Sequence, residues 1–343
     1  MKSKKLYKQL KRRPIEFARG TVQLLFLFFI LYVGLRFYLF YQHFATSGVM
    51  PFVERPSAVE GFLPVSALVG FKVWVSTGEF DQIHPAGLVL FTFIVGSGLL
   101  FRRSFCSWIC PIGTISEWTG KLGSKLTKKF FKKKTIDLPK WLTWILSPIK
   151  YLILAFFLKY ILLDMSPAAA LDFMYSQYNV VSDAKMLLFF VNISSFAVKV
   201  ILVLFVLSLF FKNFWCRFLC PYGAVIGLGS LLGITKIKRN EDTCIDCSAC
   251  TRVCPQRIKV SEKKAVLTPE CSACMLCVEA CPVKDTLTVQ VAGKKVNKWV
   301  VPAAFFVVFA VTYIIARLTG HWQTILTYDD FKYLFSMLDN IGH

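Results

Sequence analysis

Eight cysteines in the last third of the chain have a spacing that can hold iron–sulfur clusters. They form two consecutive runs, each with the pattern Cys-x2-Cys-x2-Cys-x3-Cys-Pro. Bacterial ferredoxins use this spacing, and the fourth Cys of each run binds the cluster of the other run. The predicted ligands of one [4Fe–4S] cluster are Cys244, Cys247, Cys250 and Cys281, and those of the second are Cys271, Cys274, Cys277 and Cys254.

Zinc binding and disulfide formation are the alternative uses of these cysteines. Zinc ribbons use two cysteine pairs, usually with a longer gap inside one knuckle, so four cysteines in eleven residues followed by proline fit zinc poorly. A disulfide framework needs an oxidising compartment, whereas the topology argued below places this segment on the inner side of a membrane. We therefore predict two [4Fe–4S] clusters.

Four more cysteines lie in two segments that resemble each other. Residues 101–113 and 211–223 both contain the pattern Cys-x3-Cys-Pro-x-Gly. If each segment is helical, its two cysteines lie four residues apart on one face, and the two pairs together offer four thiolates to a third redox or metal centre. These cysteines are Cys106, Cys110, Cys216 and Cys220. A dithiol/disulfide role and structural packing are the alternatives.

Basic side chains accompany these cysteines in both segments. Positive charge favours the thiolate over the thiol and stabilises a reduced, more negative centre. The basic residues concerned are Arg102, Arg103, Lys212 and Arg217.

The composition indicates a membrane protein. Hydrophobic residues make up 55% of the 343 residues, and several apolar runs are about 20 residues long, enough to cross a bilayer. The expected spans are Thr21–Tyr41, Pro85–Phe101, Leu142–Leu163, a helix within Met186–Phe211, and Val296–Leu318. We expect an α-helical multi-pass membrane protein of about five transmembrane helices with a two-fold internal repeat, and an inserted α+β ferredoxin domain of the bacterial 2[4Fe–4S] type.

The membrane topology also explains the net charge of +21. It would suit nucleic-acid binding, but the basic residues gather beside the apolar runs, as the positive-inside rule describes. The first apolar run is too long for a signal-peptide core and is expected to stay as the first helix. The expected organisation is a basic cytoplasmic segment (1–20), a membrane domain with four helices (21–234), a cytoplasmic ferredoxin domain (235–296), and a fifth helix with an outer tail (297–343).

Several smaller features have a membrane interpretation too. Residues 61–74 are apolar but short, which favours an interfacial or re-entrant piece. Lys199 lies within the fourth expected helix, where it must snorkel or take part in an ion relay. In the tail, a surface helix is expected from the spacing of Trp322, Ile325, Leu326, Leu334, Phe335 and Leu338.

The two Cys-x3-Cys-Pro segments followed by the double ferredoxin run resemble the NapH/NosR-type membrane polyferredoxins. The segments Phe52-Val-Glu-Arg-Pro56 and Glu60-Gly-Phe-Leu-Pro64 are most similar to the YccM-like branch of that family. The resemblance implies quinol-linked electron transfer in the bacterial inner membrane, with the clusters on the cytoplasmic side. The flavin-carrying outer domain of NosR-type proteins is not found in this sequence.

Quinone chemistry moves protons as well as electrons, so its site needs a titratable group near the membrane surface. His84 is the best candidate because imidazole exchanges a proton near neutral pH, and Glu60 and Arg55 are further candidates. An interfacial or helix-start hydrogen bond is the alternative role for His84. Haem is not expected, because the sequence has no Cys-x2-Cys-His and only four His.

The leading hypothesis is therefore electron transfer between the quinone pool and an unidentified redox protein, as a quinol dehydrogenase or its electron-transfer subunit. The alternative is a redox sensor, metal-ion reductase or assembly factor for another respiratory complex, in which His43, His84 and His321 present a metal. A third possibility is a structural subunit whose clusters only hold the fold. Membrane lipid is an expected partner, and nucleic acid is not.

Overall fold

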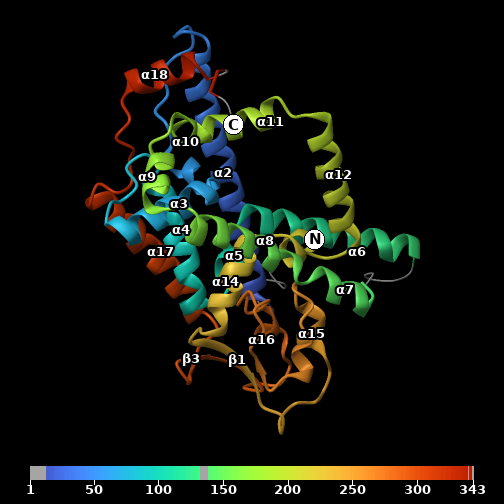
Figure 1. Ribbon diagram of the computed structural model, residues 1–343. Helices are drawn as coiled ribbons and strands as arrows, with labels where there is room; N and C mark the ends of the chain where they lie inside the picture. Colours follow the sequence, from blue (N-terminus) through green and yellow to red (C-terminus); the bar gives the residue numbers. More distant parts are fainter. Residues whose placement is uncertain (1–12, 132–137, 339, 342–343) are drawn as a thin grey trace. The chain divides into compact units, whose positions relative to one another are not determined.

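The computed structural model describes residues 13–131, 138–338 and 340–341 (Figure 1). Its contacts divide the chain into two compact units. Unit 1 comprises residues 1–28, 94–154 and 201–308, and unit 2 comprises residues 29–93, 155–200 and 309–343. Because the long helices pass from one unit into the other, each unit is described by itself. Outside the described residues lie the basic residues before position 13, Lys132 to Lys134, and His343.

Unit 1 contains all twelve cysteines. Parts or all of these helices belong to it: α2 (Pro14–Ala45), α4 (Pro85–Phe101), α5 (Ser104–Trp108), α6 (Pro111–Phe131), α7 (Lys140–Leu146), α8 (Ile149–Leu158), α12 (Ser195–Phe210), α13 (Phe214–Phe218), α14 (Pro221–Leu231) and α17 (Val300–Leu318). Both Cys-x3-Cys-Pro segments have the same order of elements, an apolar helix, a five-residue helix and a third helix that begins at the proline.

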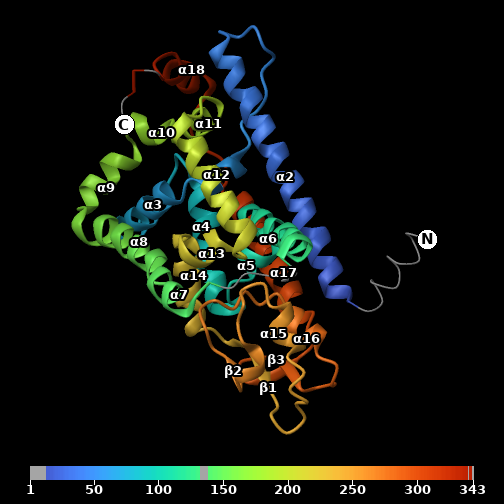
Figure 2. The same cartoon turned by 90° about the vertical axis from the view of Figure 1, so that its right-hand side faces the viewer.

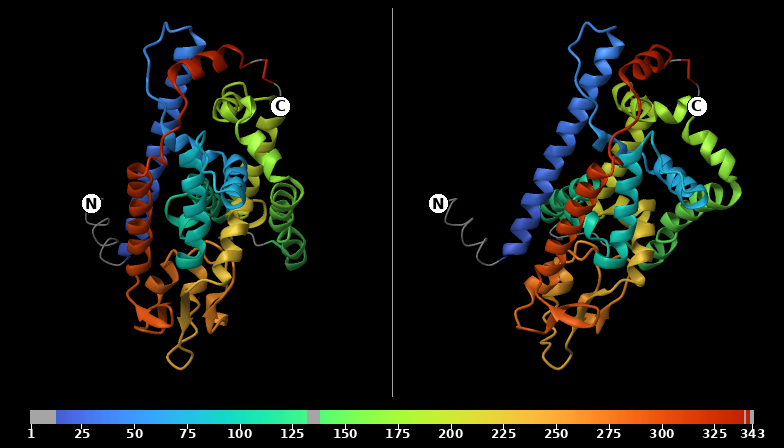
Figure 3. Two further views of the ribbon diagram at one scale, coloured as in Figure 1. Left: turned by 60° about the vertical axis from the view of Figure 1, so that its left-hand side comes forward. Right: turned by 90° about the vertical axis from the view of Figure 1, so that its left-hand side faces the viewer.

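The ferredoxin module is the lobe between α14 and α17 (Figures 2 and 3). Its four-stranded antiparallel sheet has the order β2-β1-β3-β4. The strands are β1 (Thr235–Arg239), β2 (Ala265–Val266), β3 (Leu287–Val291) and β4 (Lys294–Val296). Ile237 pairs with Val266 on one side and with Val289 on the other. Ile237 and Val266 pack in one buried cluster with cysteines of both runs. Two short helices, α15 (Ala249–Val253) and α16 (Leu276–Ala280), carry Cys250 and Cys277.

Unit 2 gathers the segments expected on the outer side. Besides the other ends of the long helices it contains the helical turn η1 (Ser57–Phe62), α3 (Pro64–Thr77), the π-helical turn η2 (Lys159–Asp164), α9 (Pro167–Met174), α10 (Gln177–Val180), α11 (Ser182–Val191) and α18 (Tyr328–Ser336). One apolar core includes Phe37, Phe40 and Phe331, and a second joins α3 to α9 through Val73 and Met174.

Within the described residues, three helices are long and apolar enough to cross a membrane. They are α2, the helix from Lys140 to Asp164, and α17. A fourth is added if α11 and α12 count as one broken span. The expected second helix forms over the same residues as α4, Pro85–Phe101, but its 17 residues are fewer than in the other spans.

The expected fourth helix is not continuous. Its two parts, α11 and α12, are bent by 81° at residues 192–194. The break has a local cause, since the Ser194 hydroxyl accepts a hydrogen bond from the Ala197 amide (3.2 Å) and starts a new helix there. Lys199 lies exposed on α12.

The outer tail also differs from the expectation. Within the described part of the tail after α17, the helix runs from Tyr328 to Ser336, because Thr327 forms a capping box with Asp330 and fixes the start of α18. Trp322 instead lies in the turn before α18, against the ring of Tyr313.

Candidate functional site

Two cavities in the ferredoxin module are each lined by four cysteines. One cavity is lined by Cys244, Cys247, Cys250 and Cys281. A second cavity is lined by Cys254, Cys271, Cys274 and Cys277. These are the two sets of cysteines that the crossed ferredoxin spacing predicts, and their role as cluster ligands stays a prediction.

The backbone has the same unusual shape in both runs. Asp246 and Ser248 have positive φ angles of 48° and 53°, and the matching residues Ala273 and Met275 have 44° and 61°. Non-glycine residues adopt this conformation only where the surrounding structure enforces it. Alternation of right- and left-handed residues turns successive backbone N–H groups toward one concave side, a feature of many iron–sulfur sites. Both runs therefore fit an anionic cluster.

The thiols do not converge on a single point among the described residues. All twelve cysteines are free, and among the described residues no three His, Cys, Asp or Glu side chains converge closely enough for one metal ion. A single tetrahedral zinc needs four sulfurs at about 2.3 Å from one point. Thiols spaced around a cavity suit a cube whose iron atoms sit at separate corners.

Electrostatics indicates that these cysteines need a positive partner. Burial, followed by the neighbouring Cys274 and Cys271, raises the pKa of Cys254 to about 12. Burial likewise raises the pKa of Cys277 far above its ordinary value, and Cys274 adds to the effect. Thiolate is the form that binds metal, so the iron of a bound cluster would supply the missing positive charge.

The four remaining cysteines lie at two helix–turn–helix corners. Cys106 is in α5 and Cys216 in α13, whereas Cys110 and Cys220 stand just before the prolines that open α6 and α14. The expectation that each pair shares one helix face is therefore wrong. A residue before proline is driven out of the helical conformation, and Cys220 has the extended angles φ −73° and ψ 110°. Its Sγ caps α14 by accepting a hydrogen bond from the Gly223 amide (3.3 Å).

The glycines of the two motifs have a steric role. A Cβ on Gly113 would stand 2.3 Å from the carbonyl oxygen of Cys106, and one on Gly223 would stand 2.6 Å from the Arg103 guanidinium. Real Cβ atoms do not approach a backbone oxygen so closely, so Gly113 lets α6 fold back against its cysteine turn. At Gly223 the atom approached is the end of the Arg103 side chain, which can move.

We call Cys106, Cys110, Cys216 and Cys220 the membrane thiol site, because the four thiols influence one another. Burial, then Cys106 and Cys216, raises the pKa of Cys110 well above the ordinary value. Burial, then Cys220 and Cys106, raises the pKa of Cys216 to about 12, while Arg103 opposes the shift. The two distant corners thus meet in one place.

Arg103 is the basic residue of the membrane thiol site. It is 1% exposed, and it donates to the Cys216 carbonyl oxygen (3.3 Å). The neighbouring Arg102 turns to the ferredoxin module instead, where it donates to the carbonyl oxygens of Thr235 (3.3 Å) and Thr268 (2.6 Å). The expectation that Arg102 favours the thiolates has no contact to support it.

A buried charge bridge joins this site to the ferredoxin module. Glu270, which precedes the predicted ligand Cys271, forms ion pairs with Arg103 (2.9 Å) and with Lys150 of α8 (2.5 Å). Both cations are 1% exposed. A buried charge left without its partner is strongly destabilising, so the bridge fixes these three segments together.

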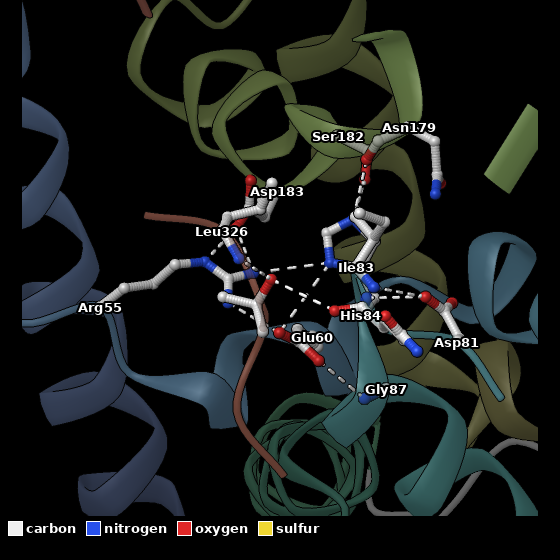
Figure 4. A network of polar contacts seen from close by, with 12 residues as sticks. Arg55, Glu60, Asp81, Ile83, His84, Gly87, Asn179, Ser182, Asp183 and Leu326 are labelled. Atoms are coloured by element: carbon white, nitrogen blue, oxygen red, sulfur yellow. Dashed lines mark hydrogen bonds and ion pairs between the residues drawn. The ribbon is translucent and has the colours of Figure 1, made fainter. Parts of the chain in front are cut away.

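In unit 2, the three residues expected at a quinone site form one buried network (Figure 4). Arg55 donates to Glu60 (2.7 Å) and to Asp183 (2.8 Å). The second oxygen of Glu60 accepts from the Gly87 amide (3.0 Å), and its first oxygen lies 3.9 Å from Nδ1 of His84. The network therefore brings together residues from four segments of the chain.

His84 is held both at its ring and at its backbone. Its Nε2 lies 2.7 Å from the carbonyl oxygen of Asn179, and its backbone amide donates to Asp81 (2.9 Å). Asp81 is fully buried, and its second carboxylate oxygen has no partner.

Charge complementarity fixes the ionisation of this network. Burial alone would lower the pKa of His84, but Glu60 raises it above the ordinary value. Burial would raise the pKa of Glu60, yet Arg55 and His84 hold it below the ordinary value. Burial raises the pKa of Asp81. The His84 and Glu60 pair is thus favoured as an ion pair, and it gives the network a group that can release a proton.

The other histidines have separate surroundings. His43 contacts the Tyr328 hydroxyl (2.8 Å) and the Met50 carbonyl oxygen (2.6 Å). His321 packs against the ring of Phe80 and is exposed. They do not join His84 in a metal site among the described residues.

Comparisons with known proteins give the family. A family model described as a 4Fe-4S binding domain matches twice, at residues 83–130 and 196–240. A model described as a 4Fe-4S dicluster domain matches residues 236–282. The chain is 38% identical over 332 residues to YccM of Escherichia coli K12, whose name describes an electron transport protein, covering 95% of this chain and 91% of YccM. The chain belongs to the NapH/NosR-type family of membrane polyferredoxins.

Other members of the family match a smaller part. The ferredoxin-type protein NapH of Escherichia coli K12 is 28% identical over 59% of this chain and 66% of its own length. The regulatory protein NosR of Pseudomonas aeruginosa PAO1 is 28% identical over 58% of this chain and 26% of its own length. No solved structure matches the chain. As a polyferredoxin of this family, the protein carries out iron–sulfur electron transfer.

Four residues of this polyferredoxin's sites were not found by sequence reasoning. They are Asp183 and Asn179 in unit 2, and Lys150 and Glu270 in unit 1. Lys150 did carry a signal, because it is a lone charge within an apolar segment, where a buried partner is expected. Nothing in the sequence pattern marks the carbonyl of Asn179 as a partner of His84.

Proposed function

We propose that this polyferredoxin passes electrons between the membrane quinone pool and a redox protein through two [4Fe–4S] clusters in the ferredoxin module. Bound clusters would supply one-electron transfer. The observation that carries the proposal is the pair of cavities, each lined by four cysteines taken from both runs. Crossed ligation keeps the two cavities next to each other in one small domain, which favours a relay over a structural role.

The membrane thiol site is proposed as a third redox centre. Its four thiols come from two corners of the same design, and Arg103 offsets their negative charge. The Glu270 bridge connects it to the ferredoxin residue next to Cys271. A centre there would therefore exchange electrons with the ferredoxin module through a rigid, buried contact.

Proton handling at the quinone is assigned to the network of Arg55, Glu60 and His84, with Asp183 as a fourth member. Two carboxylates balance the guanidinium and the imidazolium. A proton can then leave or enter at His84 while Arg55 keeps the carboxylates ionised.

The topology proposed for this function has five spans. The N-terminus and the ferredoxin module are assigned to the cytoplasmic side of the bacterial inner membrane, and the loops at residues 42–84 and 164–185 and the C-terminal tail are assigned to the outer side. The basic segment that ends α6 and the scarcity of Lys and Arg near residues 164–185 support this orientation.

Electron exchange with a quinol analogue tests the proposal. Anaerobically reconstituted protein is mixed with reduced quinone, and cluster reduction is followed by its visible and electron paramagnetic resonance signals. We expect reduction of the wild type, slowed about 100-fold or more in His84→Gln and unchanged in the control His321→Gln, which alters an exposed histidine of the same unit. Dithionite must still reduce all three proteins. A wild type that exchanges no electrons with any quinone would refute the quinone link.

A further inference from the structure

A pocket at the start of α2 has no role in the functions described above. It encloses about 150 Å³, which suits a small polar group rather than a whole drug-sized ligand. It is lined by residues of α2, α6, the turn before α13, and the ferredoxin helices α15 and α16. All of these segments belong to unit 1.

The charges of the pocket favour an anion. Four cations line it, Arg13, Lys121, Lys212 and Arg252, against three carboxylates, Glu16, Glu117 and Glu279. Each carboxylate already has partners. Glu16 pairs with Arg13 (3.1 Å), and Glu279 accepts from the first amides of α2, those of Ile15 (2.8 Å) and Glu16 (3.0 Å).

Glu117 is the most strongly engaged of the three acids. It pairs with Arg19, which is 3% exposed, and with Lys121 (3.0 Å). Burial would raise its pKa, but Arg19 and Lys121 hold the pKa at about 2. Arg19, which is not one of the lining residues, shares the charge of Glu117 with Lys121. The four lining cations exceed the three lining carboxylates by one positive charge.

The pocket also offers an unused hydrogen-bond acceptor. Asn213 lines it and is 4% exposed. Its Nδ2 donates to the Pro255 carbonyl oxygen (3.1 Å), while its buried Oδ1 has no partner. Buried polar atoms are normally satisfied, so this oxygen indicates a ligand that brings a donor such as a hydroxyl as well as negative charge.

Helix α6, which forms one wall, has the pattern of a helix lying on a membrane surface. Exposed apolar residues recur every three or four positions along one side: Ile112, Ile115, Trp118, Leu122, Leu126 and Phe130. Exposed lysines flank this stripe at positions 121, 125, 128 and 129. Such a helix places its apolar stripe among acyl chains and its lysines among headgroups.

We propose that this pocket binds the headgroup of an anionic glycerophospholipid that carries free hydroxyls, of the phosphatidylglycerol type. Arg13 and Glu16 mark the polar end of the membrane helix α2, which is the depth of the phosphates. The phosphate lies among the cations, the headgroup hydroxyl donates to Asn213 Oδ1, and the acyl chains follow the stripe of α6. The lipid thereby holds the ferredoxin helices against the membrane surface.

Native mass spectrometry of the full-length holoprotein tests this site. Protein is exchanged into nanodiscs of phosphatidylcholine with and without phosphatidylglycerol, then released, and the retained lipid is counted. We expect the wild type to retain phosphatidylglycerol in preference to phosphatidylcholine. The double variant Arg13→Gln with Lys212→Gln should retain about tenfold less phosphatidylglycerol than the wild type. Asn213→Asp, which places a carboxylate at the orphan oxygen, should lose it too.

A matched control separates a built pocket from general charge. The control pair Lys125→Gln with Lys128→Gln also removes two positive charges, but from positions of α6 that do not line the pocket. This variant should retain the lipid. Equal loss in both pairs, or no lipid preference in the wild type, overturns the proposal. Glycerol 3-phosphate distinguishes the source of the anion, because displacement by this soluble headgroup at similar concentration would indicate a site for a free phosphate instead.

Discussion

The ferredoxin module and the membrane thiol site each bring four-thiol sets together, but they balance the negative charge differently. In the ferredoxin module, residues with a left-handed backbone stand between the cysteines, a conformation that in many iron–sulfur sites turns backbone amides toward one concave side. At the membrane thiol site the cysteines stand at proline-started helix corners, and the charge is balanced by Arg103. The first design is local and self-contained. The second depends on a side chain that is itself held by Glu270, so distant substitutions should affect it.

The largest effect is expected inside the ferredoxin module. Cys250→Ala removes one thiol of the first cavity, and a domain this small depends on its metal centres for stability. We expect iron and sulfide to fall by about four atoms each per chain and the module to become protease-sensitive. Retention of all iron in Cys250→Ala would show that the ligand assignment is wrong.

Glycine-to-alanine substitutions should destabilise the protein at the helix corner of the membrane thiol site but not within an apolar helix. Gly113→Ala forces a methyl group against the Cys106 carbonyl oxygen and should cost about 1–3 kcal/mol. Gly96→Ala, in α4, meets nothing within 4 Å and should stabilise the helix by about 0.5–1 kcal/mol. Thermal unfolding in detergent measures both. Equal shifts in Tm for the two variants would contradict the explanation that Gly113 is needed to avoid a clash with the Cys106 carbonyl oxygen.

Removing a charge from the buried bridge should change redox potentials more than removing the same charge at an exposed position does. Glu270→Gln leaves Arg103 and Lys150 without their shared carboxylate. The added positive charge favours a reduced, more negative centre, so midpoint potentials nearby should rise by some tens of millivolts, where about 59 mV corresponds to about 1.4 kcal/mol for one electron. Glu262→Gln makes the same charge change at an exposed pair with Lys259 and should leave the potentials unchanged. A shift of the same size in both variants would contradict a specific bridge.

The smallest effect is expected from pH. The folded-state pKa of His84 is raised, so its contribution to stability is complete below about pH 6.5 and is lost as pH rises through the raised value. Glu60, with a lowered pKa, contributes fully above about pH 4.3 and loses its contribution as pH falls. The Tm of the wild type should therefore fall from neutral to alkaline pH, by about 2–4 °C for each kcal/mol lost from the free energy of unfolding. The fall should be smaller in His84→Gln. An identical pH profile for both proteins would exclude this role.

These regions differ in how far their sequences predict them. The cysteine groups that line the two cavities of the ferredoxin module agree with the spacing of the two runs, because most of that geometry lies within one short module. Arg55 and Asp183 are 128 residues apart, and no periodicity joins an arginine in a loop to an aspartate at a helix start. The expectation that Cys106 and Cys110 share one helix face was wrong for a local reason, because Pro111 excludes Cys110 from the helix. The sequence itself contained this signal.

The most direct test of the account is the reduction of the ferredoxin module by quinol in variants of the membrane thiol site. Cys110→Ser and Cys220→Ser are compared with the wild type under anaerobic conditions, and cluster reduction is followed by electron paramagnetic resonance. The account predicts that quinol no longer reduces the module in either variant, while dithionite still does. Reduction at the wild-type rate in both variants would contradict it.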